Sequence, residues 1–117
     1  MRESYEAIHR IVAALLPGAE LASADSTANA ACFARPVVYD VLVSGAKVAG
    51  AAQRRTRHGL LHQGSIQGAH FPADFPAHFT SALGRKIEAA PLPSSILAEA
   101  TRLSSEKYGT TAWLQRV

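Results

Sequence analysis

The clearest alternation of hydrophobic and other positions lies in VVYDVLVSGAKVAGAAQRRTRHGLLHQGSI, residues 37–66. In its first part every second residue is β-branched or aromatic, and this period of two predicts a strand over residues 37–43. The alternating residues are Val37, Tyr39, Val41 and Val43. Ser44-Gly45 follows and predicts a tight turn, because glycine adopts the positive φ that such a turn requires.

Two further strands are predicted after this turn. Residues 47–52 are mostly small, and a strand of small residues lets a ligand or another backbone approach closely. A polar loop is expected over residues 53–59, and residues 60–66 then form the third strand. The pattern therefore predicts a three-stranded antiparallel meander with Lys47 near one turn and the arginines near the other.

Helices are predicted on both sides of this meander. Residues 5–16 carry apolar side chains at spacings of three and four, with Ser4 as a candidate cap and Pro17-Gly18 as the end. The apolar positions are Tyr5, Ile8, Val12, Leu15 and Leu16. Helices are also expected over residues 76–83, from Ser94 or Ser95 to about residue 103, and from Ser104 or Ser105 through Trp113. This order predicts an α+β fold with a small antiparallel sheet flanked by helices.

Composition narrows the class of protein. The chain has 117 residues, which suits a single domain over residues 1–117, and its net charge of +3 is too mild to require a nucleic-acid partner. Its one cysteine, Cys32, excludes an internal disulfide framework and a cysteine-rich zinc site. No stretch approaches the ~20 apolar residues of a membrane span, and Glu3 and Glu6 argue against a signal peptide. We expect a cytoplasmic protein that binds neither membrane nor nucleic acid.

Three groups of residues are candidates for chemistry. Lys47 is followed by small residues, so it could contact a ligand, or it could be a solvated lysine after a hairpin turn. Cys32 could be a nucleophile or a buried structural thiol. Arg54, Arg55 and Arg57 with His58 could bind a phosphate or an acidic protein surface, or form a solvated loop. The spacing of His62, His70 and His78 indicates no metal site.

The order of motifs in residues 31–66 resembles the lipoate–protein ligase A and octanoyltransferase (biotin/lipoate A/B protein ligase) family. That family's pattern is a Cys-Phe or similar pair, a Tyr-Asp-Leu-like strand, Gly-x-Lys-[Val/Ile]-x-Gly-[Ser/Ala]-Ala-Gln-Arg-Arg, and Leu-Leu-x-x-Gly-Ser-Ile. The matching segments here are Cys32-Phe33, Tyr39-Asp40-Val41, residues 45–55 (GAKVAGAAQRR) and residues 60–66 (LLHQGSI). The resemblance implies a partial domain of the biotin/lipoate ligase type, which is similar to class II synthetases.

The resemblance also implies that part of the family's domain is absent from this sequence. The family's catalytic domain is about twice as long, and its upstream half carries an Arg-Arg-x-[Ser/Thr]-Gly-Gly-type loop that has no counterpart before Ser4. The chain therefore resembles the downstream half of that domain. A half-domain leaves a sheet edge and an apolar face unpaired, so we expect a homo-oligomer or a complementing subunit.

Site residues follow from the resemblance by position. It implies that Lys47 contacts the carbonyl of an activated acyl group, and that Cys32 holds the acyl chain as a thioester in those octanoyltransferases that use a cysteine in this region. The implied substrate-binding residues are Gly45, Gly50, Ala51, Gln53, Arg54 and Arg55.

Two functions are consistent with these residues. The first is a component or truncated form of an enzyme that moves a lipoyl or octanoyl group onto a carrier-domain lysine. A ligase would need ATP and Mg²⁺, whereas a transferase would take the acyl group from acyl carrier protein without a nucleotide. The second is a non-enzymatic remnant or subunit that binds a carrier domain or complements a second chain.

Overall fold

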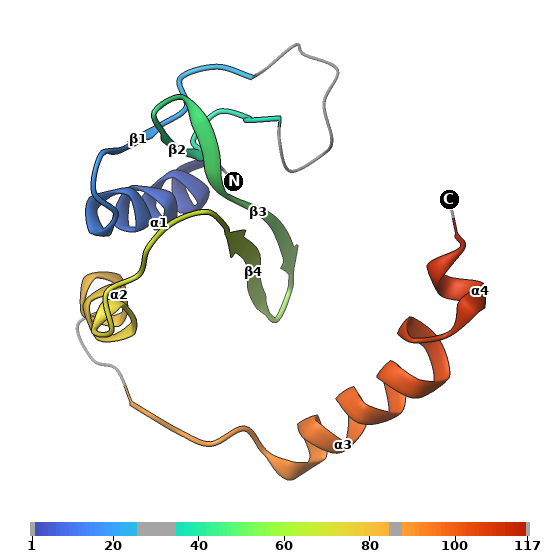
Figure 1. Ribbon diagram of the computed structural model, residues 1–117. Coiled ribbons are helices and arrows are strands. Elements are labelled where there is room, and N and C mark those ends of the chain that lie inside the picture. Colours follow the sequence, from blue (N-terminus) through green and yellow to red (C-terminus); the bar gives the residue numbers. More distant parts are fainter. Residues whose placement is uncertain (1, 26–34, 85–87, 117) are drawn as a thin grey trace. The chain divides into compact units, whose positions relative to one another are not determined.

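The computed structural model describes residues 2–25, 35–84 and 88–116. The chain divides into two compact units, Met1–Ile87 and Glu88–Val117, and each is described by itself (Figure 1). Together the elements form an α+β fold, as the sequence predicted.

The first unit begins with helix α1, Arg2–Leu15. Its face toward the core is buried at His9, Val12 and, just past its end, Leu16. Gly18, with φ of +69°, turns the chain after the helix. The expected cap at Ser4 is wrong, because the helix starts earlier. The Ser4 hydroxyl instead donates a hydrogen bond from the helix to Gln53 Oε1 in the sheet (3.1 Å).

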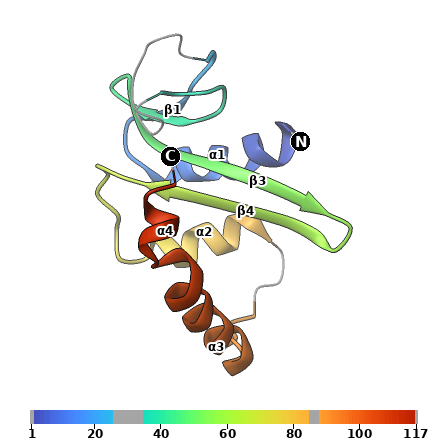
Figure 2. The ribbon, with the colours of Figure 1, turned by 90° about the vertical axis from the view of Figure 1, so that its right-hand side faces the viewer.

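An antiparallel sheet follows with strand order β1-β2-β3-β4. The strands are β1 Ala19–Leu21, β2 Val41–Val43, β3 Ala46–Thr56 and β4 Gly59–Ile66. The predicted three-stranded meander is confirmed as β2-β3-β4, and β1 extends it on one side. Figure 2 shows β3 and β4 running side by side as the two longest ribbons of the sheet.

The two hairpin turns differ in how well the sequence predicted them. The Ser44-Gly45 turn is confirmed, with φ of 49° and 78° at its two residues. The polar loop expected over residues 53–59 is wrong: β3 continues to Thr56, and Arg57 and His58 alone form the turn. Polar side chains are compatible with a strand here because both faces of this end of the hairpin are largely exposed.

The first predicted strand is only half correct, because residues 37–40 form a turn. Tyr39 has φ of 72°, and the Asp40 N–H donates to the Val37 carbonyl (2.9 Å). The Asp40 carboxylate in turn accepts from the Val37 N–H (2.8 Å). These local hydrogen bonds override the β propensity of the two valines and tyrosine.

The core of the first unit lies between α1 and the sheet. Its buried residues are Val12, Leu16, Val41, Val48 and Ala49. Helix α2, Phe75–Leu83, packs against α1 and adds Phe75 and Phe79 to this core. The predicted helix over residues 76–83 is thus confirmed, and Gly84 ends it as expected.

The second unit is helical. Helix α3, Ser94–Leu103, is confirmed and runs into a π-helical turn, η2, Ser104–Tyr108. The expected continuous helix through Trp113 is wrong, because a separate short helix, α4 Thr111–Leu114, starts after Gly109 and is capped by Thr110. No helix in the described parts of the chain is both long and apolar enough to cross a membrane.

Candidate functional site

Asp40 lies at the centre of the most polar buried site in the first unit. Its side chain has no exposed surface, yet it bears a carboxylate. Tyr5 Oη donates to Oδ1 at 2.5 Å, while Oδ2 accepts from the Val37 N–H and from Lys47 Nζ, each at 2.8 Å. Three donors on a buried carboxylate replace the water it has lost, so the charge can be kept inside the fold.

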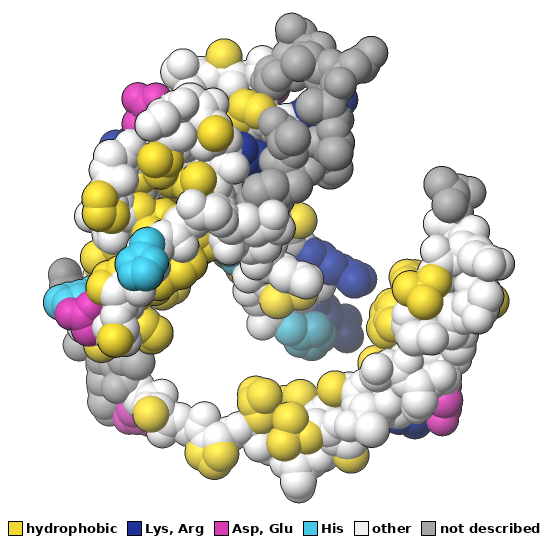
Figure 3. All heavy atoms as spheres, in the orientation of Figure 1, with side chains coloured by type: hydrophobic (Ala, Val, Ile, Leu, Met, Phe, Trp, Pro, Cys, Tyr) yellow, Lys and Arg dark blue, Asp and Glu magenta, His cyan; other side chains and the backbone are white. Residues whose placement is uncertain are grey.

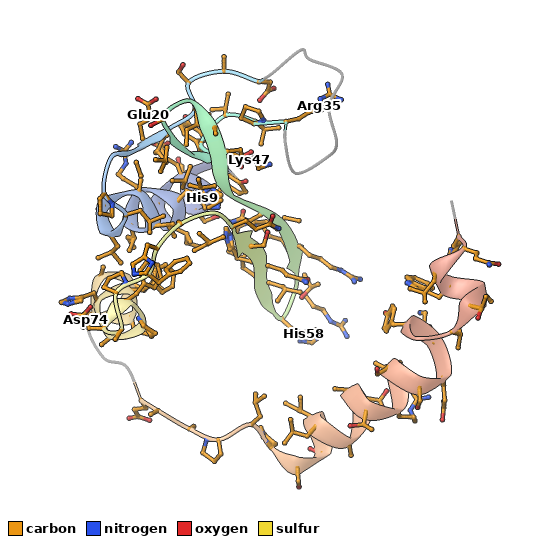
Figure 4. The ribbon with its side chains drawn as sticks, viewed as in Figure 1. His9, Glu20, Arg35, Lys47, His58 and Asp74 are labelled. Atoms are coloured by element: carbon orange, nitrogen blue, oxygen red, sulfur yellow. The ribbon has the colours of Figure 1, made fainter. Side chains whose placement is uncertain are left out.

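Lys47 reaches this carboxylate from the start of β3. Its side chain is 9% exposed, and its ammonium also donates to the carbonyl of Arg35 (3.1 Å). The side chain therefore points into the protein, and a solvated lysine after the hairpin turn does not describe it. Figure 4 labels Lys47 beside β3 and His9 at α1.

Gly50 makes room for the Lys47 side chain. A Cβ on Gly50 would lie 2.5 Å from Lys47 Cε, 2.7 Å from Nζ and 3.2 Å from Asp40 Oδ1. The ammonium thus lies directly over the backbone of β3, three residues along the strand from its own Cα. Only glycine leaves this space, so the Gly-Ala-Lys-Val-Ala-Gly order has a physical reason in the packing of Lys47.

Tyr5 connects α1 to the same carboxylate and to β3. Its hydroxyl donates to Asp40 and accepts a hydrogen bond from the Ala51 N–H (3.1 Å). Burial and, next, the hydrogen bond to Asp40 raise the pKa of the Tyr5 hydroxyl above its ordinary value. Tyr5 therefore stays protonated and acts as a donor to Asp40.

A second set of polar side chains adjoins the first through ring contacts. The His9 ring lies 4.1 Å from the Tyr5 ring and 5.5 Å from the His62 ring, measured between centroids. His9 Nδ1 donates to the Tyr39 carbonyl (2.6 Å), which fixes its tautomer. Burial lowers the pKa of His9. The pKa of His62 is lowered mainly by burial and secondly by repulsion from a positive charge on the nearby His9 ring. Both rings therefore favour the neutral form.

A chain of three hydrogen bonds leads from β3 to α1, back to β3 and on to β4. Arg55 Nη2 donates to Ser4 Oγ (2.9 Å), and this hydroxyl donates to Gln53 Oε1 (3.1 Å). The amide nitrogen of Gln53 donates to His62 Nδ1 (3.0 Å), so the remaining proton of neutral His62 is on Nε2. These contacts hold Gln53 and Arg55 against α1.

A groove of about 200 Å³ lies between α1, α2 and the β3–β4 hairpin. Its walls are mainly apolar, with two histidines among them. The lining residues are Ile8, His9, Val12, Ala49, Gly50, His62, Gly64, Ser65, Ile66, Phe75 and Phe79. Because Gly50 and His9 belong both to this groove and to the surroundings of Lys47, the buried ion pair and the apolar groove share one wall.

The residues proposed from the sequence fall into three places. Lys47 and Gly50 lie at the buried ion pair, and Ala51 and Gln53 contact α1 beside it. Gly45 lies in the β2–β3 turn. Arg54 is exposed on β3, and Figure 3 shows basic side chains gathered where the hairpin projects. Cys32 lies outside the described residues, so its role stays a prediction.

Sequence reasoning missed Tyr5, His9 and Asp40 as members of the site. Asp40 carried a usable signal, because a carboxylate directly before three apolar strand residues must be either exposed or paired. Tyr5 and His9 carried none, since an aromatic residue on the apolar stripe of a helix usually belongs to the core. Within residues 2–25, 35–84 and 88–116, no three His, Cys, Asp or Glu side chains gather as a metal site.

The sequence profile of the Biotin/lipoate A/B protein ligase family matches residues 2–69, which is more than half of the chain. The chain belongs to this family. The matched segment contains α1, the whole sheet and every residue of the Lys47–Asp40 site. No curated protein and no solved structure matches the chain. Its correspondence to the downstream half of the family's domain stays a prediction.

Proposed function

We propose that this chain is a component or truncated form of a lipoate–protein ligase or octanoyltransferase. It would move a lipoyl or octanoyl group onto a lysine of a carrier domain. The observation that carries the proposal is the buried Lys47 ammonium beside Gly50, on a wall shared with an apolar groove. A cation next to an apolar groove suits a ligand with a polar carbonyl end and an aliphatic tail.

In this reaction the amine of the carrier lysine attacks the acyl carbonyl carbon. An amide bond forms between the lysine nitrogen and the acyl carbon, and the bond from that carbon to the donor breaks. The donor leaves with the bonding electron pair, as a thiolate from a thioester or a phosphate from an acyl-adenylate, and takes up the proton that the amine loses. Negative charge develops on the carbonyl oxygen during the attack, and the Lys47 ammonium would stabilise it. Asp40, 2.8 Å from Lys47 Nζ, is a positioning residue that holds the ammonium along β3.

The donor of the acyl group distinguishes the two forms of the proposal. In a transferase, Cys32 would take the acyl chain from acyl carrier protein as a thioester and then release it to the carrier lysine. Cys32 is three residues before Arg35 in the sequence, and the Arg35 carbonyl accepts a hydrogen bond from Lys47. This proximity along the chain supports a shared site for the thiol and the ammonium.

In a ligase, ATP would first activate the acyl carboxylate, with Mg²⁺ bound to its phosphates. The described residues do not present a ligand set for that ion. Asp40 is fully buried, and its two oxygens already accept from Tyr5, Val37 and Lys47. We therefore assign no step to Mg²⁺. What favours the transferase form is the presence of Cys32 in the sequence.

A second function, binding of a carrier domain without catalysis, is supported by the charge of the hairpin. Residues 41–73 contain no Asp or Glu, whereas Arg54, Arg55 and Arg57 are exposed at the far end of β3 and the turn. A basic projection of this kind favours an acidic partner, as a lipoyl carrier domain or acyl carrier protein would be.

Intact-mass spectrometry after incubation with octanoyl-acyl carrier protein tests the enzymatic proposal. We expect a mass increase of one octanoyl group that is absent in Cys32→Ala and greatly slowed in Lys47→Met. Lys107→Met, in the second unit, is the matched control and should behave as the parent protein. A parallel incubation with lipoate, ATP, Mg²⁺ and a lipoyl carrier domain tests the ligase form, read as a mass increase of one lipoyl group on the carrier domain. No octanoyl adduct on this chain and no lipoyl group on the carrier, together with binding of the carrier domain, would leave the binding function and overturn the enzymatic one.

A further inference from the structure

The β3–β4 hairpin has two faces, and its register assigns each side chain to one of them. Residues paired across two antiparallel strands lie on the same face, and successive residues of a strand alternate between faces. Ala51 and Gln53 contact α1, so their face of the hairpin is the one toward the helix. The residues that alternate with them, and the partners of these residues on β4, form the outer face, which points away from α1. Its pairs are Gly50 with Ser65, Ala52 with Gln63, and Arg54 with Leu61.

The outer face has a cation at each end. Lys47 Nζ reaches it at Gly50, where it lies 2.7 Å from the position that a Cβ on Gly50 would take. Arg54 is exposed on the same face, four residues further along β3. At ~3.3 Å per residue, the backbone positions of Gly50 and Arg54 are about 13 Å apart. The outer face therefore presents an ammonium and a guanidinium at a separation that the strand fixes.

Small and polar side chains lie between the two cations. Ala52, Gln63 and Ser65 are all exposed. The Ser65 hydroxyl and the Gln63 amide can each donate and accept hydrogen bonds. Residues 41–73 contain no Asp or Glu, so these strands place no carboxylate where it would repel an anion. This surface suits an extended ligand that has a carbonyl at one end, amide groups along its length and an anion at the other end.

We propose that the outer face binds the phosphopantetheine arm that carries the acyl group as a thioester. The Lys47 ammonium would contact the thioester carbonyl, the arm would run along β3 over Ala52, and Arg54 would bind the phosphate. This inference rests on the transferase form of the proposed function, in which the donor is an acyl thioester. It adds a binding site for the part of the donor that lies beyond the reacting bond.

The length of the arm agrees with the separation of the two cations. About fourteen bonds join the thioester carbonyl carbon to the phosphorus, and extended backbone covers ~3.3–3.6 Å for every three bonds, so the extended arm spans roughly 16 Å. The ~13 Å between Gly50 and Arg54, together with the length of the arginine side chain, matches this span. The two amide groups of the arm would lie near Gln63 and Ser65, and an arginine fork binds phosphate through two parallel hydrogen bonds.

Arg55 differs from Arg54 although the two are neighbours in the sequence. Arg55 donates to the Ser4 hydroxyl of α1 (2.9 Å), and its partner on β4 is Leu60. Its side chain therefore belongs to the face toward α1, whereas Lys47 occupies the space over Gly50 on the outer face. The two arginines allow a test of which face of the same strand binds the phosphate.

Binding of an unreactive ligand tests the site separately from acyl transfer. The probes are two octanoyl-pantetheine analogues in which an amide replaces the thioester, one with the phosphate and one without it. By isothermal titration calorimetry we expect the parent chain to bind the phosphorylated amide about tenfold more tightly. Arg54→Gln should bind both amides equally, whereas Arg55→Gln should keep the preference. Arg10→Gln, at an exposed position of α1, is the matched control and should keep it too.

A larger side chain in the middle of the outer face tests the path of the arm. Ala52 is exposed, so Ala52→Phe should fold normally and weaken the binding of both amides. Leu60→Phe, on the face toward α1, is its control and should bind both as the parent chain does. The proposal would be overturned if the parent chain bound neither amide or bound both equally, or if Arg55→Gln rather than Arg54→Gln removed the preference for phosphate.

Reactive donors separate this inference from the proposed function and identify the source of the arm. Octanoyl-acyl carrier protein and octanoyl-CoA share the arm, whereas octanoyl-N-acetylcysteamine retains only the end next to the thioester and has no phosphate. Arg54→Gln should slow acyl adduct formation from the first two donors about tenfold more than from the third. An effect on the carrier-protein donor alone would identify that protein as the source of the arm. Adducts that form from all three donors without any effect of Arg54→Gln would leave acyl transfer standing and overturn the arm site. Phosphate-dependent binding of the amide without any adduct would keep the arm site and overturn acyl transfer.

Discussion

Lys47 Nζ lies 2.8 Å from Asp40 Oδ2, and the carboxylate of this pair has no exposed surface. The pair joins β3 to the turn before β2, and Tyr5 joins it to α1. One ion pair therefore fixes three parts of the first unit around the proposed acyl site. Its contribution to stability is separable from its contribution to chemistry, because each partner can be replaced alone or together.

Removing one partner should destabilise the protein more than removing both. Asp40→Leu leaves a nearly buried ammonium without its carboxylate, and we expect a loss of about 3–5 kcal/mol in the free energy of unfolding. Lys47→Met should also be destabilising. The double variant Asp40→Leu with Lys47→Met should regain much of this loss, because apolar side chains of similar size fill the space. Urea unfolding measures all of these values, and additive losses in the double variant would contradict the coupling.

Gly50→Ala should displace the Lys47 ammonium. The new methyl group would lie 2.5 Å from Lys47 Cε, so either the side chain or the strand must move, and we expect a loss of about 1–3 kcal/mol. In a Lys47→Ala background the same substitution should be much less harmful, since Lys47 Cε and Nζ are gone and only Asp40 Oδ1, at 3.2 Å, stays close. Thermal unfolding of the four chains measures this difference. An equal loss in both backgrounds would show that Gly50 is needed for another reason.

The sequence predicted correctly those helices and turns whose local residue pattern matches the burial and backbone conformation that they have in the fold. The apolar stripe of α1 belongs to a helix that buries one face in the core, and Ser44-Gly45 is a residue pair that readily adopts the positive φ values of the turn it forms. It was insufficient at residues 37–40, where a buried carboxylate bends a strand-like segment into a turn. Side chains from α1 and β2–β3 meet only through tertiary packing, so Tyr5 and His9 could not be assigned to the site from spacing. Lys47 and Gly50 were identified through the family's motif, and the structure supplies the steric reason for their order.

Stability should fall as the pH decreases below about 6.5, the ordinary pKa of histidine. Burial lowers the pKa of His9 and His62 in the folded state, so the unfolded chain binds protons that the folded chain resists. The contribution of each ring is therefore fully present above about pH 6.5 and is lost as the pH falls toward the lowered pKa. Thermal unfolding between about pH 5 and 7.5 measures the effect, in a range above the titration of ordinary carboxylates.

Asparagine variants are the control for this pH dependence. His9→Asn keeps a donor near the Tyr39 carbonyl, and His62→Asn keeps an acceptor near the Gln53 amide. The double variant cannot take up these protons, so its midpoint temperature should change less between these pH values than that of the parent chain. An unchanged slope in the double variant would mean that other groups control the acid sensitivity.

Tyr5→Phe should weaken the connection between α1 and the buried carboxylate without emptying the core. The ring remains, but Asp40 Oδ1 loses its donor at 2.5 Å and the Ala51 N–H loses its acceptor at 3.1 Å. A buried group left unsatisfied costs about 1–3 kcal/mol, and more when it is charged. Amide hydrogen exchange gives a local readout, because the Ala51 N–H should exchange faster relative to its neighbours on β3. Tyr108→Phe, on the exposed surface of the second unit, should leave both stability and Ala51 exchange unchanged. If Ala51 exchange is equally slow in Tyr5→Phe, the hydroxyl does not hold the helix to the strand, and Lys47 and the Val37 N–H would position Asp40 without it.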